Sequence, residues 1–263
     1  MPNRNLILAV LAAMLVSMPV TFAQSGLEVM KKNDEQISSN DEKVKITMTL
    51  INDKGKTRVR QVERFRITDK NNNRSSLIRF LYPADVKDTG FLEIEHSDKP
   101  DDSWLYLPAL NKSRRISAAN ETDNFMSSEF TYEDLGSEKL DQFKYTLKGS
   151  EKINNAECFV ILAEPASDII LKQSGYSKRI LYISKDHYVT MRIDYYDKEG
   201  KLHKQLSSEN IKQIEGTDKW RAGKLSMKNL QTNYSTLLEF ESFTINKGIS
   251  PDVFTLRNLE TGN

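Results

Sequence analysis

The sequence predicts a mainly β protein built on one large antiparallel sheet that forms a barrel or curves strongly. Short segments of alternating apolar and polar residues recur from Val44 to Phe240, and short turns rich in Asn, Asp and Gly separate them. About ten to eleven strands are expected, and an open sheet of that size curls. No internal repeat, low-complexity segment or Pro-, Ser- or Gly-rich linker interrupts the pattern, so residues 24–263 are expected to form a single domain.

The first 23 residues have the composition of a secretory signal peptide. Arg4 supplies a positive charge, residues 6–16 form a short apolar run, and Thr21-Phe22-Ala23 precede a cleavage site before Gln24. The apolar run is too short to span a bilayer comfortably. We therefore expect cleavage after Ala23 and export to the bacterial periplasm.

Charge and cysteine content exclude several classes of protein. The chain has 38 Lys and Arg residues against 37 Asp and Glu residues, and Arg4 lies in the leader, so the exported chain is neutral. A neutral chain is a poor match for nucleic acid or for non-specific adhesion to anionic membranes. Cys158 is the single cysteine and lies in an apolar segment, so we expect it to be a buried small hydrophobic residue.

A few segments are not strands. Ser25 can cap a helix over about residues 26–38, and a second, short helix is expected near 132–135, after a stretch without alternation. The segment 249–255 predicts a C-terminal clip that places Phe254 in an apolar slot.

No motif for catalysis or cofactor binding is present in the sequence. It lacks a nucleophile elbow, a zinc-protease helix, a phosphate loop and a dinucleotide-binding loop. His96, His187 and His203 are scattered, and we expect them to be solvated or capping residues rather than metal ligands. Glu93 and Glu95 share one strand face and are expected to be solvated. We therefore expect no enzyme activity and no cofactor.

Apolar strand faces are the best candidates for a binding site. Trp104 and Tyr106 share one face of a strand, and Leu105 and Leu107 share the other, so both faces can be covered. One face could line a ligand, and ordinary core packing is an equal alternative. We expect some of the following residues, each on the more apolar face of its strand, to line one continuous concavity: Met48, Ile78, Phe80, Ile94, Trp104, Tyr106, Met191 and Leu238.

Two adjacent arginines follow the aromatic strand. Arg114 and Arg115 point to opposite faces of a regular strand, so one of them faces the concave side, where a buried guanidinium needs a partner. Glu129, Glu133 or Asp134 could be that partner and hold a helical plug closed, or the arginine could meet a lipid headgroup. The alternative is that both arginines lie on the surface.

Five motifs lie close together in the first half of the chain: residues 82–87 (YPADVK), 89–92 (TGFL), 104–110 (WLYLPAL), 114–116 (RRI) and 130–134 (FTYED). Together they resemble the LolA-like outer membrane lipoprotein-sorting proteins, in the branch often encoded beside efflux-type transporters. Two turn positions depart from that pattern. Asp88 stands where glycine is common, and Ser127 stands in a Met-Gly-Ser-like slot.

The resemblance implies both a fold and a ligand class. The fold is an unclosed antiparallel half-barrel with short helices covering its concave face. The expected ligand is a lipoprotein acyl chain or a related lipid. A monomer would carry it from an inner-membrane transporter, with the efflux type as the candidate, to an outer-membrane acceptor. A carrier suits such cargo because each exposed methylene costs about 0.8 kcal/mol.

Two alternatives to a carrier are an RseB-like periplasmic sensor of lipid or peptide and an accessory binding module of a transporter. RseB-like regulators share the half-barrel and carry a second C-terminal domain. The present chain ends soon after Phe254, which favours the carrier.

Overall fold

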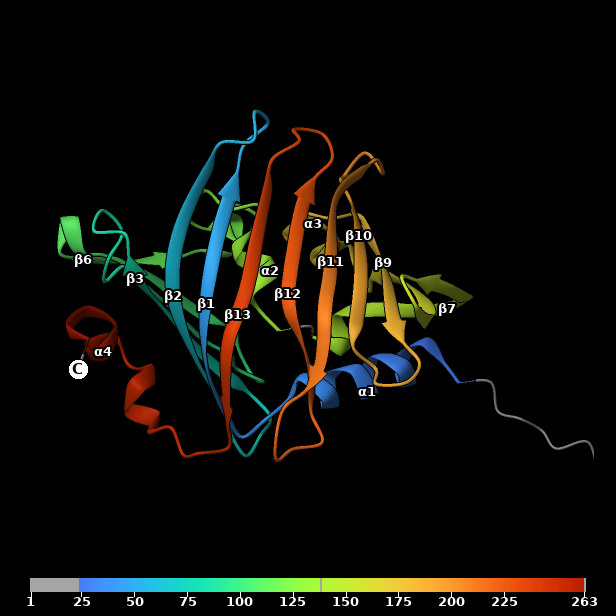
Figure 1. Ribbon diagram of the computed structural model, residues 1–263, viewed down its shortest axis with the longest axis horizontal. Helices are drawn as coiled ribbons and strands as arrows, with labels where there is room; N and C mark the ends of the chain where they lie inside the picture. Colours follow the sequence, from blue (N-terminus) through green and yellow to red (C-terminus); the bar gives the residue numbers. More distant parts are fainter. Residues whose placement is uncertain (1–23, 138, 263) are drawn as a thin grey trace, which may run out of the picture.

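One antiparallel sheet dominates the computed structural model, which describes residues 24–137 and 139–262 (Figure 1). Over these residues the sheet has 13 strands in the order β6-β5-β4-β3-β2-β1-β13-β12-β11-β10-β9-β8-β7, more than the ten or eleven expected. The strands are β1 (Asp41–Ile51), β2 (Thr57–Thr68), β3 (Arg74–Tyr82), β4 (Gly90–Ile94), β5 (Asp102–Leu107), β6 (Lys112–Ile116), β7 (Phe143–Ile153), β8 (Ala156–Pro165), β9 (Lys178–Ser184), β10 (Thr190–Tyr196), β11 (Leu202–Gln213), β12 (Trp220–Asn229) and β13 (Ser235–Ile245). The expected signal peptide, residues 1–23, lies outside the described residues.

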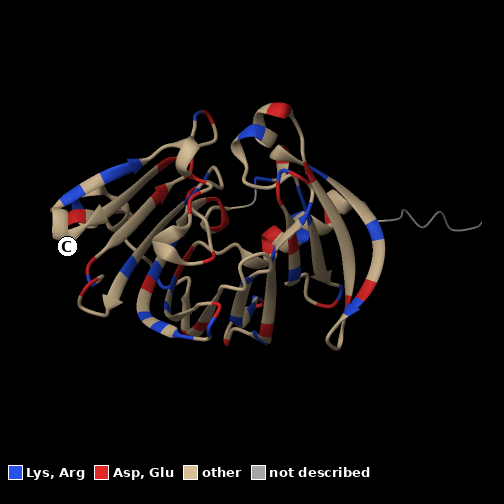
Figure 2. Ribbon diagram, turned by 90° about the horizontal axis from the view of Figure 1, so that it is seen from above, with Lys and Arg blue, Asp and Glu red and all other residues tan. Residues whose placement is uncertain are grey.

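The sheet is an open arch, as the view from above shows (Figure 2). Its edge strands, β6 and β7, do not pair with each other in the described structure, so the barrel stays unclosed. All neighbouring strands are consecutive in the chain except β1 and β13, which bring the two halves together at the centre. This confirms the expected half-barrel. The sheet is curved because a twisted sheet of this many strands curls instead of staying flat.

Helices and 3-10 turns are short and lie at the ends and faces of the arch. They are α1 (Gly26–Ile37), η1 (Pro108–Leu110), η2 (Ala118–Asn120), η3 (Phe125–Ser127), α2 (Tyr132–Leu135), η4 (Leu140–Gln142), α3 (Asp168–Gln173), η5 (Pro251–Phe254) and α4 (Leu256–Thr261). Both helices expected from the sequence, at 26–38 and 132–135, are present. Within the described part of the chain, no helix has the length and apolar character needed to cross a membrane.

Helix α1 crosses one end of the arch and packs against β7, β8 and β12 (Figure 1). Ser25 caps it through a capping box with Glu28, whose backbone N–H donates to Ser25 Oγ at 3.2 Å. Val29 and Met30 are fully buried between the helix and β8 and β9. Helix α1 therefore covers one end of the arch, from β7 and β8 to β12.

The C-terminal segment covers the convex face of β2–β5. Its residues 249–261, the C-terminal cover, place Phe254 and Leu259 in a cluster with Leu77, Leu92 and Tyr106. Phe254 is 6% exposed, which confirms the expected C-terminal clip. The opposite, concave face of the same strands is covered by a different segment, described below.

Candidate functional site

The concave face is a continuous apolar surface made by alternate residues of the central strands. Its register follows from strand pairing: residues directly opposite each other across two strands share a face. Thus Met48 lies opposite Leu238, and Val62 lies opposite Phe80. The buried members contributed by the sheet are Val44, Ile46, Met48, Leu50, Val62, Ile78, Phe80, Phe91, Leu105, Ile116, Tyr195, Leu206, Met227 and Leu238.

A segment between β6 and β7 fills this face with aromatic side chains. We call residues 117–136 the lid; it contains η2, η3 and α2 and packs against the concave face, with α2 behind the central strands in Figure 1. Its Phe125, Phe130 and Tyr132 are 0%, 5% and 9% exposed. The Phe125 ring centroid lies 5.8 Å from that of Phe80 and 5.5 Å from that of Phe91. The lid thus occupies the space in which a ligand on the concave face would lie.

Buried polar groups fasten the middle of the lid to the sheet. Arg60 Nη1 donates to the Met126 carbonyl at 2.5 Å, and burial lowers the pKa of Arg60. Lys204 Nζ, on a side chain that is 2% exposed, donates to the Glu129 carbonyl at 2.9 Å. Asn229 Nδ2 donates to Glu129 Oε2 at 2.9 Å. Such bonds replace water–polar contacts and add little net stability, so they position the lid more than they stabilise it.

The end of the lid is held by its own carboxylates. Ser174 Oγ and the Gly175 N–H, from the connection between β8 and β9, donate to Glu133 at 2.5 and 2.7 Å. Tyr176 Oη donates to Asp134 at 3.0 Å. Burial raises the pKa of Glu133 and of Tyr176. The lid therefore bridges the two halves of the arch.

A small depression opens at the edge of the lid, at the end of the arch opposite α1. It has a volume of about 210 Å³ and is bounded by the β1–β2 turn, the β12–β13 turn and the lid. Its lining residues are Leu50, Ile51, Asn52, Lys56, Arg58, Ser127, Glu129, Tyr234, Ser235 and Thr236. Because Leu50 also belongs to the apolar cluster of the concave face, this depression is the mouth of that face.

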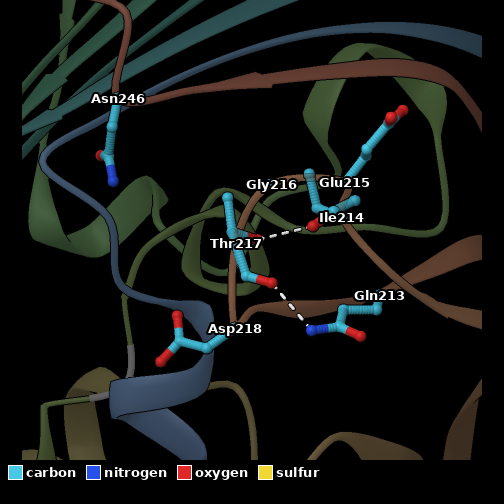
Figure 3. A pocket seen from close by; sticks show the side chains of 7 residues that line it. All are labelled: Gln213, Ile214, Glu215, Gly216, Thr217, Asp218 and Asn246. Carbon is cyan, nitrogen blue, oxygen red and sulfur yellow. Dashed lines mark hydrogen bonds between the residues drawn. The ribbon is translucent and has the colours of Figure 1, made fainter.

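A second depression, of about 630 Å³, lies at the β11–β12 turn (Figure 3). Thr217 Oγ1 donates to the Ile214 carbonyl at 2.8 Å, and Gln213 Nε2 donates to the Thr217 carbonyl at 2.8 Å. Figure 3 shows the carboxylates of Glu215 and Asp218 directed away from each other. The polar groups of this depression hold the β11–β12 turn together and do not point toward a common position. The depression is therefore not the candidate binding site.

The structure places only four of the eight residues expected to line the concavity on the concave face: Met48, Ile78, Phe80 and Leu238. Ile94, Trp104 and Tyr106 lie on the convex face under the C-terminal cover. Met191 packs with Cys158 and Tyr182 in a further cluster. Alternation shows which residues share a face but not which face is concave, and on β5 the concave residues are Leu105 and Leu107.

Met191 has a more local explanation. The pairing of β10 with β9 shifts between Thr190 and Arg192, so Met191 is the extra residue of a β-bulge. A bulge reverses the alternation beyond it, which moved Met191 away from the face that Ile193 and Tyr195 share.

Arg114 and Arg115 do not hold the lid. Both are exposed on the edge strand β6, and Arg115 forms an ion pair with Asp102. Glu129, Glu133 and Asp134 do hold the lid, but through partners on the other half of the arch. An edge strand at the open side of an arch leaves long side chains in water, which explains why these arginines face solvent.

Sequence reasoning missed the lid aromatics and the cations Arg60 and Lys204. A signal for the aromatics was present, because residues 120–136 lack alternation yet contain Phe125, Phe130 and Tyr132, and large apolar side chains in a loop must find cover. No pattern distinguishes Arg60 or Lys204 from the other cations of their strands.

The described residues contain no candidate metal centre. No group of three or more His, Cys, Asp or Glu side chains there could hold a metal ion. His187 stacks on Trp220 with 3.6 Å between ring centroids, and His96 contacts Asp102 at 3.0 Å. Cys158 is buried, and burial raises the pKa of its thiol.

Comparison with known proteins identifies the family. A family model described as an uncharacterized protein matches residues 72–261. A DUF1329 family protein from Desulfovibrio piger is 27% identical, with 89% of this chain and 97% of that chain covered and a TM-score of 0.83. The chain belongs to the DUF1329 family. No curated protein matches it.

Two further structures extend this placement. A domain from Vibrio parahaemolyticus, described as an outer membrane lipoprotein-sorting protein domain, is 32% identical, with 89% of this chain and 98% of that chain covered and a TM-score of 0.83. A LolA superfamily protein from Nitrosomonas europaea is 16% identical, with 89% and 99% covered and a TM-score of 0.69, and shares the fold. The resemblance to LolA-like lipoprotein-sorting proteins, expected from the motifs, is confirmed.

Proposed function

We propose that this DUF1329 protein is a periplasmic carrier that binds a lipid acyl chain on its concave face in place of the lid. The observation that carries the proposal is the filling of an apolar concave face by three aromatic side chains of a segment outside the sheet. The composition of residues 1–23 supports export, and the description of the Vibrio parahaemolyticus domain supports a role in lipoprotein sorting. An inner-membrane transporter as donor and an outer-membrane acceptor belong to the same proposal.

The lid can leave the face at limited cost. Its residues form only 3-10 turns, one turn of helix and a single bridge, Asn124 with Thr131, so no rung of the sheet breaks when it moves. When the aromatic rings of the lid move away from Phe80 and Phe91, apolar surface becomes exposed on the lid and on the sheet. An acyl chain on the concave face covers the sheet again and gains about 0.8 kcal/mol for each methylene that it buries. Ligand binding and lid release are therefore coupled, because the acyl chain takes the place of the lid rings.

Backbone strain favours the same exchange. Met126 and Ser127 are consecutive non-glycine residues with φ of 48° and 60°. The left-handed region costs roughly 1–2 kcal/mol per residue for L-amino acids, so the closed lid is strained at the point where Arg60 holds it. Release of the lid removes this strain.

A fluorescent hexadecanoic acid probe tests the proposal. We expect saturable binding to the wild type, with faster amide exchange in residues 117–136 once the probe is bound. Arg60→Met should accelerate probe uptake because it removes the bond to Met126, whereas the exposed Arg257→Met on α4 should not. A wild type that binds no acyl probe and shows unchanged lid exchange would refute the carrier.

A further inference from the structure

The concave face changes from apolar to basic along two neighbouring strands. Val62 and Phe80 belong to its apolar cluster. Farther along the same face, toward α1, β2 carries Arg64 and Arg66 and β3 carries Arg74, because alternate residues share a face and the β2–β3 register is unbroken from Val62 onward. Arg74 is 5% exposed, and Arg64 and Arg66 are half-buried.

A fourth guanidinium reaches this place from β12. Arg221 Nη1 donates to the Gln36 carbonyl at 2.6 Å, and its Nη2 donates to the Ile37 carbonyl at 3.2 Å, at the C-terminus of α1. Arg221 Nε and Arg64 Nη2 donate to the two oxygens of Glu42 at 3.2 and 2.8 Å. We call Arg64, Arg66, Arg74 and Arg221 the arginine cluster.

The arginine cluster has more positive charge than its partners neutralise. Two carboxylates form ion pairs with it in the described structure: Glu42 with Arg64 and Arg221, and Asp34 with Arg74 at 2.7 Å. The Arg66 side chain forms no hydrogen bond or ion pair with any described residue. The buried Nε–H groups of Arg64 and Arg74 also lack a partner. Buried donors and unpaired charges of this kind are costly unless an anion binds them.

The nearby carboxyl groups do not supply that anion. Burial, then the charges of Glu95 and Asp101, raise the pKa of Glu93 to about 8, so Glu93 is mostly neutral at pH 7 and leaves Arg66 uncompensated. Glu95 accepts the backbone N–H of Arg74 at 3.0 Å. Burial, then the charge of Arg64, lower the pKa of Arg66 to about 10, so its guanidinium remains charged at neutral pH.

We propose that the arginine cluster binds the anionic headgroup, a carboxylate or a phosphate, of a lipid whose acyl chain lies on the apolar part of the concave face. The inference rests on the proposed carrier function for the acyl chain. Guanidinium groups bind both anions through paired, charge-assisted hydrogen bonds. Acyl groups joined to a protein through amide or ester bonds carry no such charge, so the site selects a free anionic lipid.

Arg66 separates this role from a structural one. Arg74 and Arg221 attach α1 to the sheet, and Arg64 pairs with the buried Glu42 of β1, so replacement of any of these three would loosen the fold as well as the site. Arg66 has no such contact. Arg66→Gln should therefore leave the melting temperature unchanged or raise it, because it removes repulsion from like charges. The exposed Arg257→Gln is the matched control.

Competition against the fluorescent hexadecanoic acid probe measures headgroup recognition. Dodecanoate and dodecyl phosphate are compared with dodecanol, which has the same chain length and no charge. For the wild type and Arg257→Gln we expect the anionic compounds to compete roughly tenfold more tightly than the alcohol, as charge-assisted hydrogen bonds to a guanidinium imply. For Arg66→Gln we expect this advantage to shrink to about twofold or less. Inorganic phosphate is added to the same proteins in a thermal melt at constant ionic strength.

Each outcome decides between the roles. Equal competition by acid and alcohol in the wild type overturns the headgroup site even if the carrier function holds. A second outcome is that no acyl compound binds, but inorganic phosphate raises the melting temperature of the wild type and not that of Arg66→Gln. This result refutes the carrier and leaves the arginine cluster as a site for a small anion. An Arg66→Gln protein that melts well below the wild type, with its preference for anions intact, makes Arg66 structural and overturns the proposal.

Discussion

The same strands of this sheet carry a cover on each face, and the two covers are built differently. On the convex face, the C-terminal cover places Leu259 directly on the backbone of β4, where a Cβ at Gly90 would lie only 2.6 Å from Leu259 Cδ1. Its polar attachment to β3 is the half-buried Arg79, whose Nη2 donates to the Asn258 carbonyl at 2.7 Å. This is close packing of an ordinary core.

On the concave face, the lid buries three aromatic side chains and is fastened by buried charge and strained backbone. Lys204 is 2% exposed and donates to a lid carbonyl, and Met126 and Ser127 have positive φ. Both covers bury apolar side chains almost completely, so burial alone does not distinguish them. The difference lies in how each cover is attached.

The largest expected effect is on the convex face. Leu259→Ala should lower the free energy of unfolding by about 3 kcal/mol, because a fully buried leucine leaves a cavity against a rigid strand. Leu256→Ala, in the same helix and 42% exposed, should cost less than about 0.5 kcal/mol. Urea denaturation measures both. A loss below about 1 kcal/mol for Leu259→Ala would show that the C-terminal cover is also releasable.

Phe125→Ala, on the concave face, should cost less than its complete burial suggests. A core phenylalanine costs about 3–5 kcal/mol, but the loss cannot exceed the free energy of opening the lid, so we expect about 1–2 kcal/mol. Amide exchange in residues 117–136 should rise while that of β1 and β2 stays unchanged. Phe80→Ala, in the sheet opposite, should cost the full amount. Equal losses for the two phenylalanines would make the lid an integral part of the core.

A rise in pH from acidic values toward 8 should weaken the closed lid. Burial raises the pKa of Glu93 to about 8, and burial also raises the pKa of the lid residues Glu121 and Glu133. The ordinary pKa of a glutamate side chain is 4.5, so the folded pKa of Glu93 lies above its unfolded pKa. The corresponding stability is fully present below pH 4.5 and is lost as the pH rises through 8. Glu93 faces the end of the lid, where a Cβ at Gly136 would lie 3.2 Å from Glu93 Oε1.

Glu93→Gln tests this pH dependence. The variant should lose about 1 kcal/mol less stability than the wild type between pH 5 and pH 8, a value reduced for the solvent screening of a half-buried group. Thermal melts across that range measure the difference. The exposed Glu239→Gln serves as the control and should follow the wild type. Parallel pH profiles for wild type and Glu93→Gln would contradict the expectation.

The smallest expected effect concerns two turn residues that lie in the left-handed backbone region, which favours glycine. Asp88 and Ser127 both have positive φ, of 64° and 60°. Glycine should relieve up to about 1 kcal/mol of strain at either position, partly offset by the greater freedom of the unfolded chain. Ser127→Gly stabilises the closed lid and should weaken probe binding by up to about fivefold. Asp88→Gly, in the β3–β4 turn, should leave binding unchanged, and equal effects on binding would exclude a specific role for lid strain.

Local patterns in the sequence determined much of the fold. Alternation predicted the sheet, Ser25 and the following periodicity predicted α1, and the motifs of residues 82–134 predicted the family. The two turn positions singled out in the sequence, Asp88 and Ser127, both have positive φ, which favours glycine and is a local property of each turn.

Only the tertiary structure decided which face of each strand became concave. Trp104 and Leu105 are adjacent and both apolar, so the direction of sheet curvature, set by all 13 strands together, placed Leu105 inside and Trp104 outside. The bulge at Met191 reversed a face without leaving a mark in the sequence. The arginine cluster combines residues from β2, β3 and β12, and its excess charge depends on long-range pairing and burial, which no single stretch of sequence contains.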